Sequence, residues 1–487
     1  MERADGPGDG RRVPGIEATP EFASVDQIHE LIGRREISVV DVVRASLERL
    51  DRVNPSLGAV VAVRAEAALT EAKAADRIPV ENRGALFGVP YTVKDVTETL
   101  DLPTTYGSVA FEGHRTGFEA DVVTLLRAAG AILIGKTNTP ELACEPVTRS
   151  ELFGETLNPF APERTPGGSS GGAAAGLATG MFTLAQGTDG GGSIRIPASC
   201  CGVVGVKPTR GRVSFAPAAY EPWGGLLHSG PMARSVRDAA SMLDVMSGGG
   251  DCRAACEMPL GRIRAAYASA VPGGHLDPDV AAAFADALGV LTSVGVELCE
   301  DAPDLAVVPE LFAPIAEVAF AGIGNDLTDE QLARIGPKCL QLMTRGWRIT
   351  AAEYYATLQA AHRETARIQR FWETYDVLVT PTVPWVPPRR DAFPSIEAYD
   401  AKWAEYGVWE TFTSPWNLTG QPAISLPCRK TGDGHVPIGL QLVGRLGGDA
   451  DLFAIAASFE AAAPWDYRHA LAASGEAQRA FLKSDLQ

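Results

Sequence analysis

The chain has 487 residues, of which 46% are hydrophobic and 21% charged, a balance that excludes whole-chain disorder and allows a sizeable core. Its formal net charge of −17 disfavours binding to nucleic acid or to an anionic membrane, because both are negatively charged. The N-terminus lacks the apolar segment of a secretory signal, so we expect a cytoplasmic protein. The eight cysteines are too sparse for a disulfide framework and complete no zinc site, so we expect no metal and no other cofactor.

The N-terminal part of the chain predicts a tail followed by helices. Residues 1–19 combine Gly, Pro and charge without periodicity and predict a mobile tail. The first strong helix signal begins at Ser38, where Ser38 and Asp41 fit a capping box before apolar residues at helical spacing. The Ala-rich stretch from Val61 to Ala75 predicts more helix. We therefore expect residues 20–83 to form a helical layer away from the catalytic centre.

From residue 84 to 250, short apolar strands alternate with helices, a pattern typical of an α/β sheet. Residues 121–129 predict a helix, and residues 131–134 predict the buried strand that follows it. A second unit of this kind has a helix over residues 170–179 and a strand over residues 181–185. Ligands of such sheets bind at loops beyond the strand ends, which is where the Gly-rich segments fall.

Residues 251–375 are predicted to be mostly helical and to form an elaboration on the substrate side. Residues 376–487 are predicted to return to the core, beginning with a strand over residues 377–384. Four tryptophans follow this strand, namely Trp385, Trp403, Trp409 and Trp416. They fit core packing and the wall of an apolar substrate pocket equally well, so the sequence leaves both interpretations open.

Two Gly-rich turns within residues 165–211 are the most informative feature of the sequence. They are Gly167-Gly168-Ser169-Ser170-Gly171-Gly172 and Gly190-Gly191-Gly192-Ser193. Backbone N–H groups at such turns converge on an anion, and glycine leaves them open to close approach. Phosphate is one candidate, but neither turn continues as a Walker loop or completes a dinucleotide fingerprint. The oxyanion of a tetrahedral intermediate accounts for both the glycines and the serine.

A serine nucleophile needs a base, and none of the seven histidines falls in a recognisable triad motif. Lysine can serve if burial keeps it neutral. Lys94 lies in the apolar run of residues 88–96, although a lysine in such a run is more often a strand-end residue with its tip in solvent. The residues alone therefore leave the identity of the base open.

Taken together, these segments resemble the amidase signature family, serine hydrolases with a Ser-Ser-Lys triad. The resemblance covers nearly the whole chain and rests on GVPYTVKD, GKTNTPE, the Gly/Ser segment, GVVGVKPTRGRVS, ARSVRDAA, LVTPTVP, NLTGQPAISLP and PIGLQLVGR. The spacing agrees as well, since Ser169 lies 75 residues after Lys94, and Ser193 lies 24 residues after Ser169.

The resemblance implies a role for each motif residue. The implied catalytic residues are Lys94 as base, Ser169 as bridging serine after a cis peptide bond, and Ser193 as nucleophile. The implied oxyanion hole consists of Gly190, Gly191 and Gly192, with the Ser193 amide. Asp189 and Arg195 match positions where the family uses charge to brace the loop. Ser170 is interpreted as a structural hydroxyl.

The implied fold is α/β, with a central mixed β-sheet covered by helices on both faces and a helical elaboration. The implied activity is hydrolysis of C–N bonds through an acyl-enzyme. We expect a small, largely apolar amide or carbamate as substrate, as in an aryl amidase or a urethanase, and a monomer or homodimer without nucleic-acid or membrane partners.

The sequence leaves two alternative functions open. One is the catalytic A subunit of a tRNA-dependent amidotransferase, which works with a tRNA-binding partner. The segment Lys136–Glu141 resembles stand-alone amidases instead. The other alternative is a non-catalytic binding protein with the same fold. It is disfavoured because all three triad positions hold the required residues.

Overall fold

The computed structural model describes residues 22–218, 221–271, 274–392, 409–432 and 434–465, so the expected tail over residues 1–19 lies outside them. Eleven strands form one sheet in the order β1-β3-β2-β6-β8-β7-β12-β13-β11-β9-β10. These strands are β1 (Val60–Val63), β2 (Pro90–Lys94), β3 (Ile132–Thr137), β6 (Leu184–Asp189), β7 (Val204–Lys207), β8 (His228–Ala233), β9 (Ile263–Tyr267), β10 (Val296–Glu300), β11 (Val377–Pro381), β12 (Ala423–Lys430) and β13 (Pro437–Gly444).

The sheet is mixed and buried on both faces, as expected. Strand β2 runs parallel to β3 and β6, and β9 runs parallel to β10 and β11, whereas the other neighbours are antiparallel. Every residue of β2, β3, β6, β7, β8, β11 and β13 is buried. Strands covered on both faces usually read as apolar runs, as VLVTP of β11 does, whereas β6 (LAQGTD) and β8 (HSGPMA) are buried although they carry polar residues.

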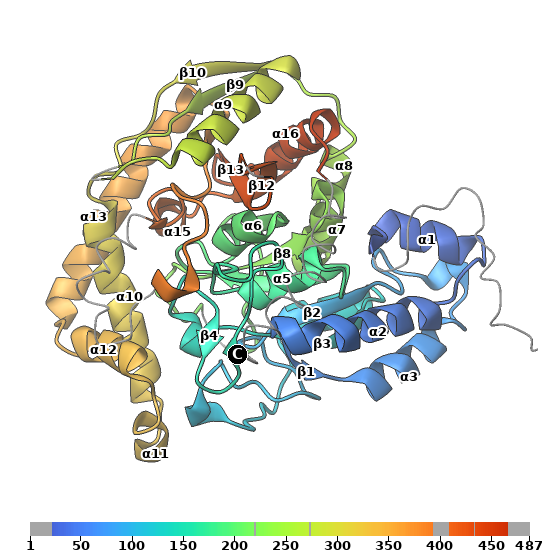
Figure 1. The fold of residues 1–487 in the computed structure, drawn as a ribbon. Coiled ribbons are helices and arrows are strands. Elements are labelled where there is room, and N and C mark those ends of the chain that lie inside the picture. The colour runs from blue at the N-terminus through green and yellow to red at the C-terminus, as the bar shows by residue number, and fades with distance from the viewer. Residues whose placement is uncertain (1–21, 219–220, 272–273, 393–408, 433, 466–487) are drawn as a thin grey trace, which may run out of the picture.

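Helices from all parts of the chain contact this sheet (Figure 1). Those in contact with strands include α2 (Val39–Leu57), α3 (Ala65–Ala75), α5 (Gly171–Ala178), α6 (Arg195–Cys201), α7 (Val236–Met246), α9 (Pro278–Ser293) and α16 (Asp449–Ala462). Shorter or more peripheral helices are α1 (Val25–Gly33), α4 (Asp121–Ala128), α8 (Cys252–Ala255) and α15 (Pro415–Thr419). Most of the predicted helices are therefore present.

The N-terminal prediction is right about helix α2 and about α3 (Ala65–Ala75), but it misses helix α1 and strand β1. Helix α2 begins after Ser38, whose side chain accepts a hydrogen bond from the Asp41 N–H at 3.1 Å, as the capping box requires. Helix α1 precedes it and was not predicted, although Ser24 caps it in the same way. Residues 61–63 belong to strand β1 and not to a helix, because pairing with β3 outweighs the helix propensity of the Ala-rich stretch.

Later elements follow the predicted order with shifted ends. The helix expected at residues 170–179 is α5, and the strand expected at residues 181–185 is β6, which starts at Leu184. The strand expected at residues 377–384 is β11, which ends at Pro381. Because the sheet takes strands from residues 60 to 444, the segment boundaries proposed for the chain stay a prediction.

Part of the helical elaboration expected over residues 251–375 forms a layer of its own at one side of the sheet (Figure 1, yellow to orange). Strands β9 and β10 from the same range belong instead to the core sheet, because they pair with β11 and with each other. The helices of the layer are α10 (Val308–Asn325), α11 (Asp329–Leu332), α12 (Pro337–Gly346) and α13 (Ala351–Gln369). Helix α10 packs on α12 and α13, and buried Phe320, Cys339 and Met343 share one apolar cluster there. Among the residues that the structure describes, no helix has the length and apolarity needed to cross a membrane.

Candidate active site

Lys94 ends strand β2 and is completely buried, with its side chain between two hydroxyl groups. Its Nζ donates to Ser169 Oγ at 2.6 Å and to Thr188 Oγ1 at 3.0 Å. Burial lowers the pKa of Lys94 to about 7, because the low-dielectric interior disfavours the ammonium form, and Asp189 opposes this shift. Of the two interpretations open for this lysine, the tip in solvent is excluded.

Ser169 lies in the first Gly-rich turn, immediately before helix α5. The peptide bond between Gly168 and Ser169 is cis, as the resemblance implies. Glycine is required at position 168, since a Cβ there would lie 2.5 Å from the backbone of Val147. The Ser169 side chain is fully buried and accepts the hydrogen bond from Lys94.

The second Gly-rich turn, Gly190–Ser193, connects β6 to α6 and lies against the first. The N–H of Ser170 donates to the Ser193 carbonyl at 3.0 Å, which fixes the two turns side by side. Ser193 is half-buried. In the part of the chain that the structure describes, the N–H groups of residues 190–193 donate no hydrogen bond, so these donors stay available to a ligand. The structure thus brings all six predicted site residues into two adjoining loops and one strand end.

A buried ion pair braces the second turn from behind. Asp189 and Arg195 are both fully buried and lie 2.8 Å apart. The Asp189 carboxylate also accepts from the N–H of Ile194 at 3.1 Å and from Asn417 Nδ2 at 2.9 Å. The Arg195 guanidinium holds the pKa of Asp189 well below its usual range against the opposing effect of burial. The loop is therefore fixed by charge, as the resemblance implies.

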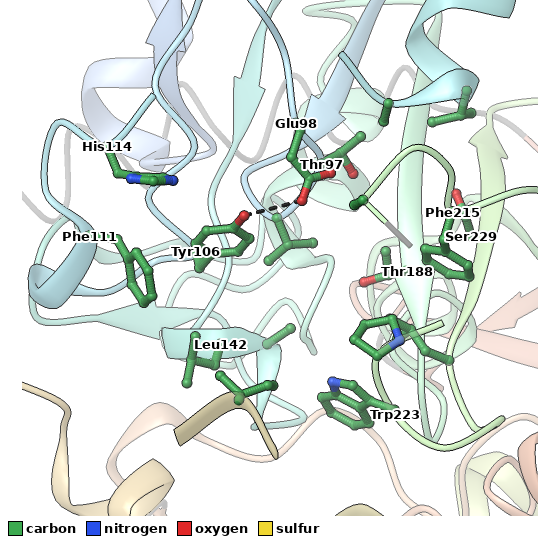
Figure 2. Close-up of a pocket in the computed structure, with 18 of the residues that line it drawn as sticks. Thr97, Glu98, Tyr106, Phe111, His114, Leu142, Thr188, Phe215, Trp223 and Ser229 are labelled. Carbon is green, nitrogen blue, oxygen red and sulfur yellow. Dashed lines mark hydrogen bonds between the residues drawn. The ribbon is translucent and has the colours of Figure 1, made fainter. Parts of the chain in front are cut away.

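A cavity of about 550 Å³ (Figure 2) reaches this site through Thr188, and its described lining contains none of the six predicted site residues. Its aromatic lining consists of Tyr106, Phe111, Phe118, Phe215 and Trp223. Thr188, which accepts the hydrogen bond from Lys94, also lines the cavity. Tyr106 Oη donates to Glu98 Oε1 at 3.1 Å within it. The described lining contains acidic Glu98 and Asp326 but no lysine or arginine.

The sequence did not identify the tryptophan that lines the cavity. Trp223 packs so closely that a Cβ at Gly190 would lie 2.6 Å from its ring. By contrast, Trp409 and Trp416 are buried core residues, and Trp385 donates to the His275 carbonyl at 2.9 Å outside the cavity lining. Trp403 lies outside the described residues. Core packing is thus the correct interpretation for Trp409 and Trp416.

Glu410 is a second residue near the site that the sequence did not single out. A Cβ at Gly191 would lie 3.2 Å from Glu410 Oε2, so the carboxyl group lies beside the glycine turn. Burial raises the pKa of Glu410 to about 7, and Lys338 opposes this effect. The signal in the sequence that could have pointed to Glu410 is its position, seven residues before Asn417, where the family motif NLTGQPAISLP begins. Within the described residues, no group of three or more His, Cys, Asp or Glu could hold a metal ion.

Comparison with known proteins assigns the family. Residues 41–453 match the family model described as Amidase. A putative amidase AmiB2 of Mycobacterium tuberculosis (strain ATCC 25618 / H37Rv) is 39% identical over 440 residues, which cover 87% of this chain and 92% of that protein. The chain therefore belongs to the amidase signature family of hydrolases that act on C–N bonds other than peptide bonds.

Two solved structures of this family have the same fold. The structure of 6-aminohexanoate cyclic dimer hydrolase complexed with substrate has a TM-score of 0.83 at 31% identity, covering 91% of this chain and 98% of that chain. The structure of a bacterial aryl acylamidase has a TM-score of 0.81 at 26% identity, covering 92% and 98%. Both confirm the α/β fold expected from the sequence.

Proposed function

We propose that the protein is a serine amidohydrolase in which Ser193 attacks the carbonyl carbon, while Ser169 and Lys94 carry the proton. The observation that carries this proposal is the hydrogen bond of 2.6 Å between Lys94 Nζ and Ser169 Oγ. A lysine with a pKa near 7 is partly neutral at physiological pH, and only the neutral amine can accept a proton.

The reaction proceeds in two halves. Neutral Lys94 accepts a proton from Ser169, which takes one from Ser193 as the Ser193 oxygen bonds to the carbonyl carbon. The charged lysine returns the proton through Ser169 to the departing nitrogen, and an acyl-enzyme remains. Water then repeats the relay and releases the acid. Amine leaving groups need this proton, so the arrangement suits amides and carbamates.

We assign the oxyanion hole to the N–H groups of Gly190, Gly191, Gly192 and Ser193. The tetrahedral intermediate carries its negative charge on the former carbonyl oxygen, and preorganised donors stabilise that charge. Two observations support the assignment. The turn is braced by the Asp189–Arg195 pair, and Thr413 Oγ1 donates to the Gly191 carbonyl at 2.7 Å, which orients the neighbouring peptides.

A covalent probe tests the nucleophile directly. A fluorophosphonate should label Ser193 of the wild-type protein, and peptide mapping should find the adduct on the peptide that contains this residue. Ser193→Ala should abolish both label and turnover. Ser170→Ala is the matched control, because Ser170 Oγ donates to the Thr188 carbonyl at 3.2 Å and has no role in the relay. Labelling of a serine other than Ser193 would contradict the proposal.

For the substrate, we propose small, largely apolar amides, in particular aryl amides and carbamates. The cavity has the size of a drug-like ligand site, and its aromatic walls favour a flat apolar group. Its acidic residues, Glu98 and Asp326, disfavour a carboxylate. A carbamate presents the same carbonyl oxygen and nitrogen as an amide, so its cleavage needs no further catalytic group.

The substrate class is tested by comparing kcat/KM for a 4-nitroanilide, its carbamate analogue, a carboxylated amide of similar size and glutamine. We expect the first two to exceed the last two by tenfold or more, about 1.4 kcal/mol of transition-state stabilisation. A tenfold preference for glutamine would instead favour an amidotransferase A subunit, the main alternative. Failure of every substrate and of the fluorophosphonate label would favour a non-catalytic binding protein.

Location and assembly also remain proposals. The net charge of −17 supports a protein without nucleic-acid or membrane partners, and a cytoplasmic location stays part of the proposal. A monomer or homodimer remains the expected assembly. Size-exclusion chromatography with light scattering measures the assembly directly, and a higher oligomer would contradict it.

A further inference from the structure

Two of the eight cysteines meet where the helical layer contacts the core. Cys144 follows the short turn η4 (Glu141–Ala143), and Cys339 lies in helix α12. Their Sγ atoms are 3.1 Å apart. Cys339 is fully buried, whereas Cys144 is half-buried. Among the described residues, no other two cysteine sulfur atoms are in such contact.

The backbone on either side of this thiol pair is already fixed. Glu141 accepts a hydrogen bond from the N–H of Gly336, which caps helix α12, at 2.9 Å. The same carboxylate accepts from Ser108 Oγ in the core at 2.6 Å. A disulfide needs an S–S bond of roughly 2.05 Å, so the two sulfur atoms must approach by only about 1 Å. Small side-chain rotations can supply this movement.

The pair also lies next to segments that line two walls of the proposed substrate cavity. Leu142 and Ala143, immediately before Cys144, line one wall and have φ values of 48° and 57°. Such positive values are unfavourable for residues other than glycine, so the surrounding contacts must hold this segment in place. The other wall includes Ile323 and Gln331 of the helical layer, and α12 packs directly on α10.

We propose that Cys144 and Cys339 form a reversible disulfide that fastens the helical layer to the core wall of the substrate cavity. This inference goes beyond the proposed function and concerns regulation of the same cavity. The oxidant is a hydroperoxide. The half-buried Cys144 sulfur attacks the terminal peroxide oxygen and becomes a sulfenic acid, while the peroxide leaves as an alcohol or water. Cys339 sulfur then attacks Cys144 sulfur, and the hydroxide leaves with the Cys339 proton as water.

The roles of the two cysteines follow from their surroundings. The oxidant must reach the first sulfur, which favours half-buried Cys144 over the fully buried partner. Burial raises the pKa of the Cys339 thiol well above its usual value, so Cys339 is the less reactive of the two thiols toward the peroxide. Thiol reductants reverse the bond and release both walls.

Peptide mapping of the full-length protein tests the bond without reference to activity. Treatment with hydrogen peroxide, followed by alkylation and digestion without reductant, should yield one crosslinked peptide pair containing Cys144 and Cys339. Dithiothreitol should remove it. Cys339→Ser should lose the crosslink, whereas Cys299→Ser, which removes an exposed thiol elsewhere, should keep it. Oxidation of Cys144 to a sulfinic acid without any crosslink would overturn the proposal.

Stability and substrate size test the consequence. The oxidised wild type should unfold at a Tm a few degrees above the reduced protein, and Cys339→Ser should show no such difference. With the walls fastened, kcat/KM for a bulky aryl carbamate should fall at least about threefold relative to a small anilide. A crosslink that changes neither Tm nor this ratio would overturn the fastening role. If no amide is cleaved at all, the crosslink map and Tm still decide the proposal.

Discussion

At the scale of single residues, the buried position of Lys94 lowers its pKa enough for the side chain to act as a base. An ordinary lysine titrates near pH 10.4 and is a poor base at neutral pH. Here the strand that carries Lys94 is buried throughout, so the ammonium form loses its hydration and gains only two hydroxyl partners. Asp189, the negative charge that acts on Lys94, is already paired with Arg195. Burial therefore outweighs the available attraction.

This lysine predicts a defined pH dependence of the rate. The neutral form grows as pH rises through about 7, so kcat/KM should increase about tenfold per pH unit below 7 and level off above it. The same shift makes the free energy of unfolding rise with pH between about 7 and 10.5, because the unfolded chain binds the extra proton there. Kinetics between pH 5.5 and 9 on one chromogenic amide measure the rate effect.

Glu410 supplies the control for that measurement, because its pKa is also about 7 and its carboxyl group lies beside the glycine turn. Glu410→Gln removes this second titration. If Lys94 is the base, kcat/KM of the Glu410→Gln variant should still rise with pH, with its midpoint near pH 7. Disappearance of this rise in Glu410→Gln would assign it to the glutamate and not to the lysine.

The buried ion pair behind the turn makes a second prediction at this scale. Arg195→Met should destabilise the protein by about 3–5 kcal/mol, because it leaves the Asp189 carboxylate buried without its partner. Urea denaturation measures the change. Arg262→Ala is the matched control, since the Arg262–Glu297 pair has side chains that are 82% and 51% exposed, where water screens the attraction and little stability is lost. Equal effects of the two substitutions would contradict the bracing role.

At the scale of elements, the Gly190–Gly192 turn combines three glycines with different surroundings. A Cβ at Gly190 would lie 2.6 Å from the Trp223 ring. Gly192 has a φ of +140°, and a Cβ there would lie 2.5 Å from Thr413 Oγ1. At Gly191 the nearest atom would be Glu410 Oε2 at 3.2 Å. Gly190 and Gly192 thus have no room for a methyl group, whereas Gly191 has nearly enough room for one.

Alanine substitutions in this turn should therefore differ in severity. Gly192→Ala adds backbone strain on the order of 1–3 kcal/mol and should lower kcat by roughly tenfold or more. Gly190→Ala should displace Trp223 and raise KM for aryl substrates. Gly191→Ala should be the mildest of the three. Steady-state kinetics on the three purified variants give the order, and a Gly191→Ala loss exceeding the other two would refute it.

At the scale of the whole molecule, the core sheet supplies the lysine and both serine turns, while the helical layer adds one wall of the cavity. The triad and oxyanion donors account for the proposed chemistry without a metal. Activity should therefore be unchanged after dialysis against EDTA, as measured with the same chromogenic amide. Loss of activity that zinc restores would overturn the proposed mechanism.

The sequence by itself determined the family, the order of most elements and the residues of the two Gly-rich turns. These features are local, because a turn that needs positive φ or a close backbone approach requires glycine at that same position in the sequence. The Ser38 capping box and the buried run around Lys94 are local in the same sense. Strand β1 was missed because its pairing partner, β3, lies more than 70 residues away in the sequence, and this pairing outweighs the local helix propensity.

The tertiary structure alone decided which side chains surround the turns. Four tryptophans near the C-terminus were candidates for the pocket wall, but Trp409 and Trp416 pack in the core, and Trp223 lines the cavity. Glu410 likewise meets its neighbours only through folding, and so do Cys144 and Cys339, which are 195 positions apart in the sequence. Such contacts depend on how helices dock onto the sheet, and no pattern within a short stretch of chain encodes that docking.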